Sequence, residues 1–183
     1  MSVNEIMSAG KINPNFIDSS SLILPIANVT NLQANLNALQ DQLNVFQFAE
    51  FFALMPPDNA VAVAVGDAVE FPQDGPSNSF ISRTTASTFA LPDVGTYEVS
   101  FCVTVAEAGQ LALALDGVLQ ARTVVGRSAL TSQIAGRFLL TTVAPVAILS
   151  RVNPAGNATA LTITALAGGT HDVSANLIVK RLQ

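Results

Sequence analysis

The sequence predicts an all-β sandwich or jelly roll of about ten short strands over residues 49–183, preceded by a short helix over residues 28–48. Apolar and polar residues alternate through GTYEVSFCVTVAE (95–107), which is typical of a strand with one buried face. An Asp-Gly pair then separates two apolar runs, a strong hairpin signal. Beyond residue 48, turn residues divide β-branched runs at short intervals, and no second helix is indicated.

Residues 1–27 predict an extended N-terminal arm. Pro14, Pro25 and three consecutive serines (19–21) separate isolated apolar residues, and neither a helical nor a strand period persists. Two interpretations remain open. The arm is either a disordered terminus or an attachment segment that becomes ordered only against a capsid or surface-layer protein.

Residues 28–48 predict a coiled-coil stalk. Apolar residues recur at alternating spacings of three and four, as at positions a and d of a heptad: Val29, Leu32, Leu36, Leu39, Leu43 and Phe46. Thr30 and Gln33 match a capping box, so the helix is expected to begin at or near Thr30. The flanking e and g positions hold uncharged amides, which specify no different partner, so we expect identical chains in parallel.

The stalk is expected to be weak on its own. It contains several asparagines, which are poor helix formers, and it is little longer than two heptads. The head must therefore supply most of the association energy. The alternative is that this amphipathic helix packs against its own domain.

The remaining strands follow from short apolar runs. Before residue 94 these are EFFALM (50–55), AVAVAVGDAVEF (60–71), SFISR (79–83) and STFAL (87–91). The central strand places Tyr97, Val99, Phe101, Val103 and Val105 on one face. Asp116 and Gly117 form the turn of the next hairpin, and further strands are expected near 131–142, 145–152, 158–165 and 172–182.

Composition limits the partners. Charged residues make up 11% of the chain, against roughly 25% in ordinary soluble domains, so part of the surface is expected to lie against other copies. The net charge of −5 and the scattered basic residues argue against nucleic acid. The start has no signal-peptide pattern, and no apolar run is long enough to span a membrane. We therefore expect no membrane insertion.

Three stretches carry a resemblance to a known group. FALPDVGTYEVSFCVTV (89–105), LALALDGV (111–118) and SANLIVKRL (174–182) resemble the jelly rolls of the tumour-necrosis-factor and complement globular-head superfamily, most of all the heads of collagen-like spore-surface and viral fibre proteins. The resemblance covers about residues 49–183, although no collagen repeat precedes them. It implies a compact homotrimer with both ends of the head at its base.

The N-terminal part carries a second resemblance. GKINPNFID (10–18) and VTNLQANLNALQ (29–40) are similar to the linkers that precede head domains in viral fibres.

Chemistry-bearing residues are few, and none predicts an enzyme or a cofactor. His171 is the single histidine and is expected in a solvated turn. Cys102, the single cysteine, is expected to be a small packed residue. Asp67, Glu70 and Asp74 form the densest acidic group; a calcium site there is the alternative to a solvated loop, and no zinc spacing occurs.

The sequence therefore favours a non-enzymatic structural or adhesive trimer, the head of a fibre or spike on a virion surface that serves host attachment or decoration. The alternatives are a spore- or cell-surface protein and a secreted trimeric signalling ligand of the tumour-necrosis-factor type. Exposed segments such as NPAGN (153–157) and GDAVEFPQDGPSNS (66–79) are candidates for contact with glycans.

Overall fold

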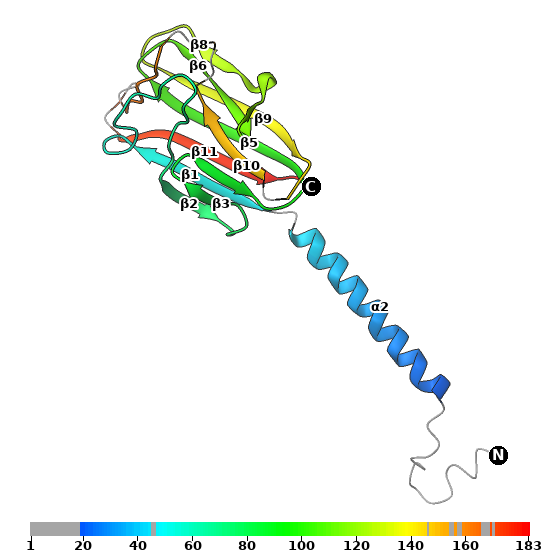
Figure 1. The fold of residues 1–183 in the computed structure, drawn as a ribbon. Coiled ribbons are helices and arrows are strands. Elements are labelled where there is room, and N and C mark those ends of the chain that lie inside the picture. Colours follow the sequence, from blue (N-terminus) through cyan, green and yellow to red (C-terminus); the bar gives the residue numbers. More distant parts are fainter. Residues whose placement is uncertain are drawn as a thin grey trace, which may run out of the picture. The chain divides into compact units, whose positions relative to one another are not determined.

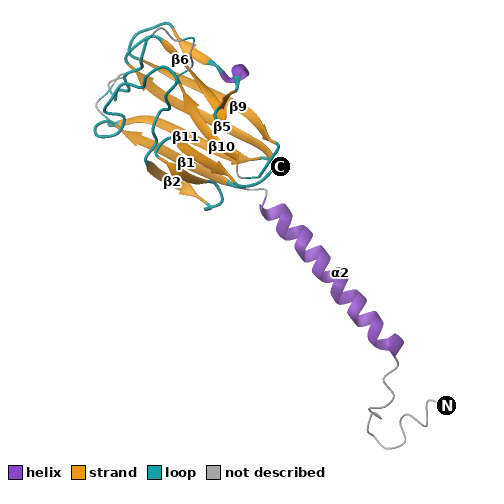
Figure 2. Ribbon diagram, in the orientation of Figure 1, coloured by secondary structure: helices purple, strands orange, loops and turns teal. Residues whose placement is uncertain are grey.

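The computed structural model describes residues 19–44, 47–145, 147–153, 156, 159–165, 169 and 171–183. The chain divides into two compact units, residues 1–44 and 45–183. The described part of the first unit is a helix, and the second unit is called the head. The described residues form one α-helix, eleven strands and a short 3-10 turn (Figure 2).

The helix, α2, spans Ser19–Asn44 and is 26 residues long. The predicted start near Thr30 is therefore wrong, and so is the extended arm from residue 19 onward; residues 1–18 lie outside the described residues. Instead of closing a capping box, the Gln33 side chain donates to the Asn37 side chain one turn later, at 2.8 Å. Pro25 lies inside the helix. A proline costs a helix about 3 kcal/mol but does not forbid it, so it was a poor boundary marker here.

The boundary between stalk and head also differs from the prediction. Strand β1 begins at Phe48, and Gln47 is 1% exposed within the head. Both residues were assigned to the stalk because the heptad count runs through them. Phe46 lies outside the described residues.

Two antiparallel sheets face each other in the head (Figure 1). The five-stranded sheet has the order β2-β1-β11-β5-β9, and the six-stranded sheet follows the order β3-β4-β10-β6-β7, with β8 paired to β6. The strands are β1 (Phe48–Leu54), β2 (Gln73–Ser77), β3 (Ser82–Thr85), β4 (Thr88–Leu91), β5 (Gly95–Val105), β6 (Gly109–Leu115), β7 (Val118–Leu119), β8 (Val125–Arg127), β9 (Ser132–Thr142), β10 (Ala147–Val152) and β11 (Val173–Arg181).

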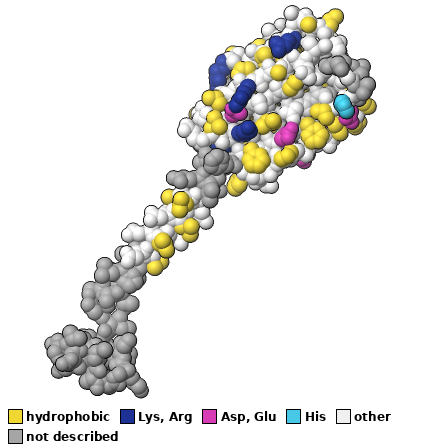
Figure 3. All heavy atoms as spheres, turned by 180° about the vertical axis from the view of Figure 1, so that it is seen from behind, with side chains coloured by type: hydrophobic (Ala, Val, Ile, Leu, Met, Phe, Trp, Pro, Cys, Tyr) yellow, Lys and Arg dark blue, Asp and Glu magenta, His cyan; other side chains and the backbone are white. Residues whose placement is uncertain are grey.

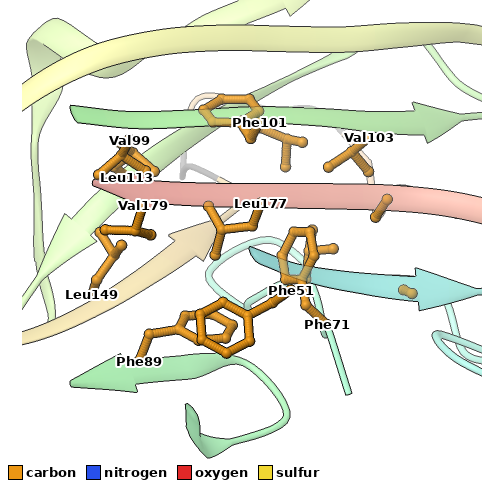
Figure 4. Packing of buried hydrophobic residues seen from close by; sticks show 14 of the residues in the cluster. Phe51, Phe71, Phe89, Val99, Phe101, Val103, Leu113, Leu149, Leu177 and Val179 are labelled. Carbon is orange, nitrogen blue, oxygen red and sulfur yellow. The ribbon is translucent and has the colours of Figure 1, made fainter. Parts of the chain in front are cut away.

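The hydrophobic core fills the space between the sheets (Figure 4). Strand β5 is its centre: Tyr97, Val99, Phe101, Val103 and Val105 are each at most 4% exposed. Phe89 from the opposite sheet contacts Phe51, with ring centroids 4.5 Å apart, and Phe71, at 6.1 Å. The hairpin after β6 turns at Asp116 and Gly117, whose φ angles of 51° and 76° suit an Asp-Gly pair.

Three segments differ from the predicted strands. Residues 60–71 and 158–165 make only isolated bridges, Val63 to Leu161 and Val105 to Ile163. The alternating pattern of 60–65 reflects one buried residue, Val63, between exposed neighbours, and Gly66 then turns with φ +96°. Conversely, β2 (QDGPS) lies within the segment 66–79, which was expected to be one loop. Its apolar content is too low to identify it as a strand from sequence.

Candidate interaction surfaces

The proximal end of the head is the end at which the chain enters from α2. Hydrogen bonds to Asp93 stabilise this end. The Asp93 carboxylate accepts hydrogen bonds from the Gln47 side-chain amide at 2.5 Å and from Arg181 at 3.2 Å. Its carbonyl accepts from the hydroxyls of Tyr97, at 2.7 Å, and Thr142, at 3.1 Å. Burial raises the pKa of Tyr97, so its hydroxyl remains a donor at neutral pH. Through these bonds Asp93, in the turn before β5, connects Gln47 at the start of the head with Arg181 near its end.

Both ends of the head's chain lie here. The Arg181 amide donates to the Gln47 carbonyl at 2.8 Å, and Phe48 pairs with Lys180. Packing is tight at Gly95, where an added Cβ would lie 1.9 Å from the carbonyl oxygen of the C-terminal residue, so only glycine fits. The loops at the opposite, distal end are therefore those farthest from the point where the chain enters.

The distal loops are organised by two buried asparagines. The Asn59 side chain pairs with both main-chain groups of Glu70, each at 2.9 Å. Asn153, which is 0% exposed, donates from its side chain to the carbonyls of Val63, at 3.0 Å, and Thr159, at 3.3 Å. Because these segments do not form regular strands, side-chain amides supply the hydrogen bonds that a neighbouring strand would otherwise provide.

A carboxylate fixes a third distal loop. Glu107 accepts from both the amide and the hydroxyl of Thr162, each at 2.7 Å. Burial alone would raise the pKa of Glu107, but these hydrogen bonds outweigh it and hold that pKa below its usual value. Side-chain hydrogen bonds therefore stabilise the distal loops at several points.

The outer face is the side of the five-stranded sheet that points away from the core. Strand register aligns Glu98 with Lys180 on one side and with Leu139 on the other. Two residues along β5, Ser100 aligns with Ile178 and with Arg137. Leu139 is 50% exposed, and Ile178 is half-buried. Seen from behind, the head carries scattered hydrophobic side chains together with several basic and acidic ones (Figure 3).

One pair of charges on this face is joined within the chain, whereas Lys180 is exposed and has no partner among the described residues. Arg137 and Glu98 form an ion pair at 2.5 Å. Another protein that covers this face would bury an ion pair that is already formed, which costs less than burying either of its ions alone.

The helix presents a further apolar surface. Val29, Leu32, Leu36 and Leu39 of the predicted seam are 49–70% exposed in the single chain (Figure 3). Leu43 lies within α2, but nothing is described of its side chain. An apolar stripe this exposed is typical of a helix that associates with another.

The residues that could act in catalysis or bind a metal lie apart from one another in the structure. His171 is exposed just before β11, whereas Cys102 is half-buried on the outer face of β5. Asp74 pairs with Arg83, at 2.8 Å, away from Asp67 and Glu70 in the distal loops. Among the described residues, no three histidine, cysteine or acidic side chains come together to hold a metal ion.

Where α2 is described, it is not long and apolar enough to cross a membrane.

Comparison with known proteins shows a likeness of fold. No family model matches the chain, and no curated protein sequence matches it. The globular domain of zebrafish complement 1qA protein superposes with a TM-score of 0.51 and 11% identity, over 74% of this chain and 94% of that one. Murine APRIL gives a TM-score of 0.50 and 11% identity, over 74% and 98%. The PRD1 vertex protein P5 gives a TM-score of 0.49 at 14% identity, over 75% and 97%, a likeness too low to bear on function.

The predicted fold class is confirmed. The head is a jelly-roll-like sandwich of the kind seen in complement globular domains and tumour-necrosis-factor ligands, and a helix precedes it.

Proposed function

We propose that this protein is a non-enzymatic structural or adhesive homotrimer, the head and stalk of a fibre or spike on a virion surface. The outer face is the observation that carries the proposal. It combines exposed apolar side chains with the Arg137–Glu98 ion pair, which suits a contact between identical chains. The jelly-roll fold is consistent with self-association.

The helix supports the same assembly. Its exposed stripe offers a parallel contact between copies, but four uncharged a and d residues over about three turns give limited association energy. The head is therefore the main site of association, and the helix aligns the chains. The choice of a virion over a spore or cell surface rests on the resemblance of the N-terminal segment to fibre linkers.

The distal loops are the surface that such a trimer would present. In the described residues they expose mainly polar and aliphatic side chains; the chain has no tryptophan, and Tyr97, its single tyrosine, is buried, so two residue types common in tight protein interfaces are not available here. Weak contacts repeated over many heads suit attachment to glycans or simple decoration.

Assembly is tested by light scattering on the purified chain. We expect three times the chain mass of 19.0 kDa. Ile178→Lys combined with Leu139→Lys should give monomers, because each replaces an apolar side chain of the proposed contact with a charge that loses its hydration on burial. Thr84→Lys, exposed on β3 of the other sheet, is the matched control and should remain trimeric.

A fragment of residues 45–183 separates the contributions of head and helix. It must begin at 45 because Gln47 and Phe48 belong to the head. We expect it to remain trimeric. A monomeric fragment would assign assembly to the helix, and a monomeric full chain at micromolar concentration would overturn the proposal. Tight one-to-one binding to a protein receptor would favour the signalling-ligand alternative.

A further inference from the structure

A groove runs along one flank of the head, where the edge strand β2 of the five-stranded sheet faces the edge strand β3 of the six-stranded sheet. Its floor is formed by Phe51 and Ile81, which are 3% and 2% exposed. Its walls are polar and consist of Glu50, Asp74, Ser77, Ser79, Ser82 and Arg83. The groove is separate from the distal loops.

The charged groups of the wall are held in fixed positions. Arg83 binds Asp74 through two parallel bonds, Nε to Oδ1 at 3.1 Å and Nη2 to Oδ2 at 2.8 Å. These hydrogen bonds hold the pKa of Asp74 below its usual value, so the carboxylate stays ionised. On the other wall, Asn176 donates to Oε1 of Glu50.

Glycine makes room for the second carboxylate. A Cβ at Gly75 would lie 3.0 Å from the Glu50 side chain, so the absence of a side chain there lets Glu50 extend across β2 to the groove. Two planar carboxylates and a guanidinium are thus presented in defined orientations before any ligand arrives. Such preorganisation lowers the cost of binding.

Serine hydroxyls complete the wall. Those of Ser79 and Ser82 are exposed and have no hydrogen-bond partner among the described residues. Ser79 has φ +68°, a conformation that is unfavourable for a residue other than glycine. Phe80, next in the chain, is 45% exposed and offers an aromatic ring at the same turn.

We propose that this flank groove binds a neutral saccharide unit. Each sugar hydroxyl both donates and accepts, and the wall supplies fixed acceptors from the carboxylates, donors from Arg83, and serine hydroxyls that do either. Two carboxylates against one guanidinium leave a net negative wall, which disfavours sialylated or phosphorylated ligands. The shallow apolar floor provides no deep pocket for the anchor residue of a peptide.

The inference rests on the proposed attachment role and assigns it a ligand class and a site. It also moves the contact from the distal loops to the flank of each head, so one trimer would offer three equivalent sites.

The experiment uses the full-length chain on an array of neutral and sialylated oligosaccharides, followed by titration of the strongest neutral saccharide. We expect binding to neutral glycans. Asp74→Asn and Ser82→Ala should each weaken it, by about tenfold or more for Asp74, because a hydrogen bond to a charged group is lost. Ser128→Ala, an exposed serine outside the groove, is the matched control and should bind as the unaltered chain does.

Ser82→Ala removes only an exposed hydroxyl, so it tests the site even where Asp74→Asn lowers stability. Three results would each overturn the inference: no binding to neutral glycans, binding by both groove variants that equals that of the unaltered chain, or a preference for sialylated glycans. Light scattering of the same samples distinguishes failure of the saccharide site from failure of the proposed function. A trimer that binds no glycan rejects only the saccharide site.

Discussion

Replacing Asn153 by alanine tests whether buried amides hold the distal loops together. The side chain is fully buried, and its two donated bonds join the segment around Val63 to the segment around Thr159. The same segments share one bridge, with Val63 and Leu161 bonded both ways at 2.8 and 2.9 Å. Asn153→Ala would remove this donor from the Thr159 carbonyl, which is only partly buried, and from the Val63 carbonyl, which keeps its bond from Leu161, and would leave a small void.

The expected cost is about 1–2 kcal/mol, the lower part of the range of about 1–3 kcal/mol for an unsatisfied buried polar group, because the Val63 carbonyl keeps one donor. For a chain of this length, 1 kcal/mol lowers the melting temperature by about 2–4 °C, so a decrease of about 2–8 °C is expected. Thermal unfolding followed by circular dichroism measures it, at a fixed protein concentration because an oligomer's melting temperature depends on concentration.

Hydrogen exchange locates the effect. The amides of Val63 and Leu161 should exchange faster in Asn153→Ala, whereas those of β5 should change little below the global unfolding limit. Gln120→Ala, which removes a bond to a carbonyl two residues away, is the control and should cost less than about 0.5 kcal/mol. An Asn153→Ala protein that melts within about 1 °C of the unaltered chain would refute the reasoning.

Three further predictions follow from other parts of the chain. Aspartate at both Leu36 and Leu39 should remove helical circular-dichroism signal while the head stays trimeric; monomers would show that the helix drives assembly. Because the pKa of Glu107 is lowered by folding, its stabilisation is present above its ordinary pKa of 4.5 and is lost as the pH falls below that value, so the protection factors of the amides in the loop it binds, which correct for the intrinsic exchange rate, should fall in acid. Glu107→Gln should abolish this pH dependence, and a variant that retains it would assign the effect to another group. Gly95→Ala should lower the melting temperature by several degrees because of its clash with the C-terminal backbone, whereas Gly156→Ala, with open space around it, should cost less than about 0.5 kcal/mol; equal effects would contradict the crowding at Gly95.

Local patterns predicted the elements whose signals are complete within a few residues. Strand β5 followed from eleven alternating residues, and the Asp116-Gly117 turn followed from a dipeptide with its own conformational preference. The helix was found from its heptads, but its start was misplaced because Thr30 and Gln33 were interpreted as a capping box and Pro25 as part of an extended arm. Strand β2 was missed because QDGPS has neither alternation nor β-branched residues.

The candidate surfaces could not be predicted because they depend on pairings between distant residues. Glu50 meets Asn176 only because β1 pairs with β11, a separation of 126 residues. The flank groove requires two edge strands from different sheets to face each other, which no local pattern records. The same holds for Asn153, whose partner Val63 lies 90 residues earlier.

The position of β1 also determines how the head responds to tension. β1 runs from the proximal end between β2 and β11, and it pairs with β11 along its whole length. When the distal end or flank is held by a bound surface and the chain is pulled at Gln47, the force acts along β1. The ladder bonds on both sides are then loaded together in shear.

Pulling the head by its own two ends loads it differently. Gln47 and Arg181 are hydrogen-bonded neighbours on antiparallel strands, so separating them opens the β1–β11 ladder one pair at a time. We expect single-molecule stretching to give a higher rupture force for the first geometry than for the second, and equal forces would contradict this. A head loaded through residue 47 would thus resist detachment most strongly in the direction in which an attached particle pulls on it.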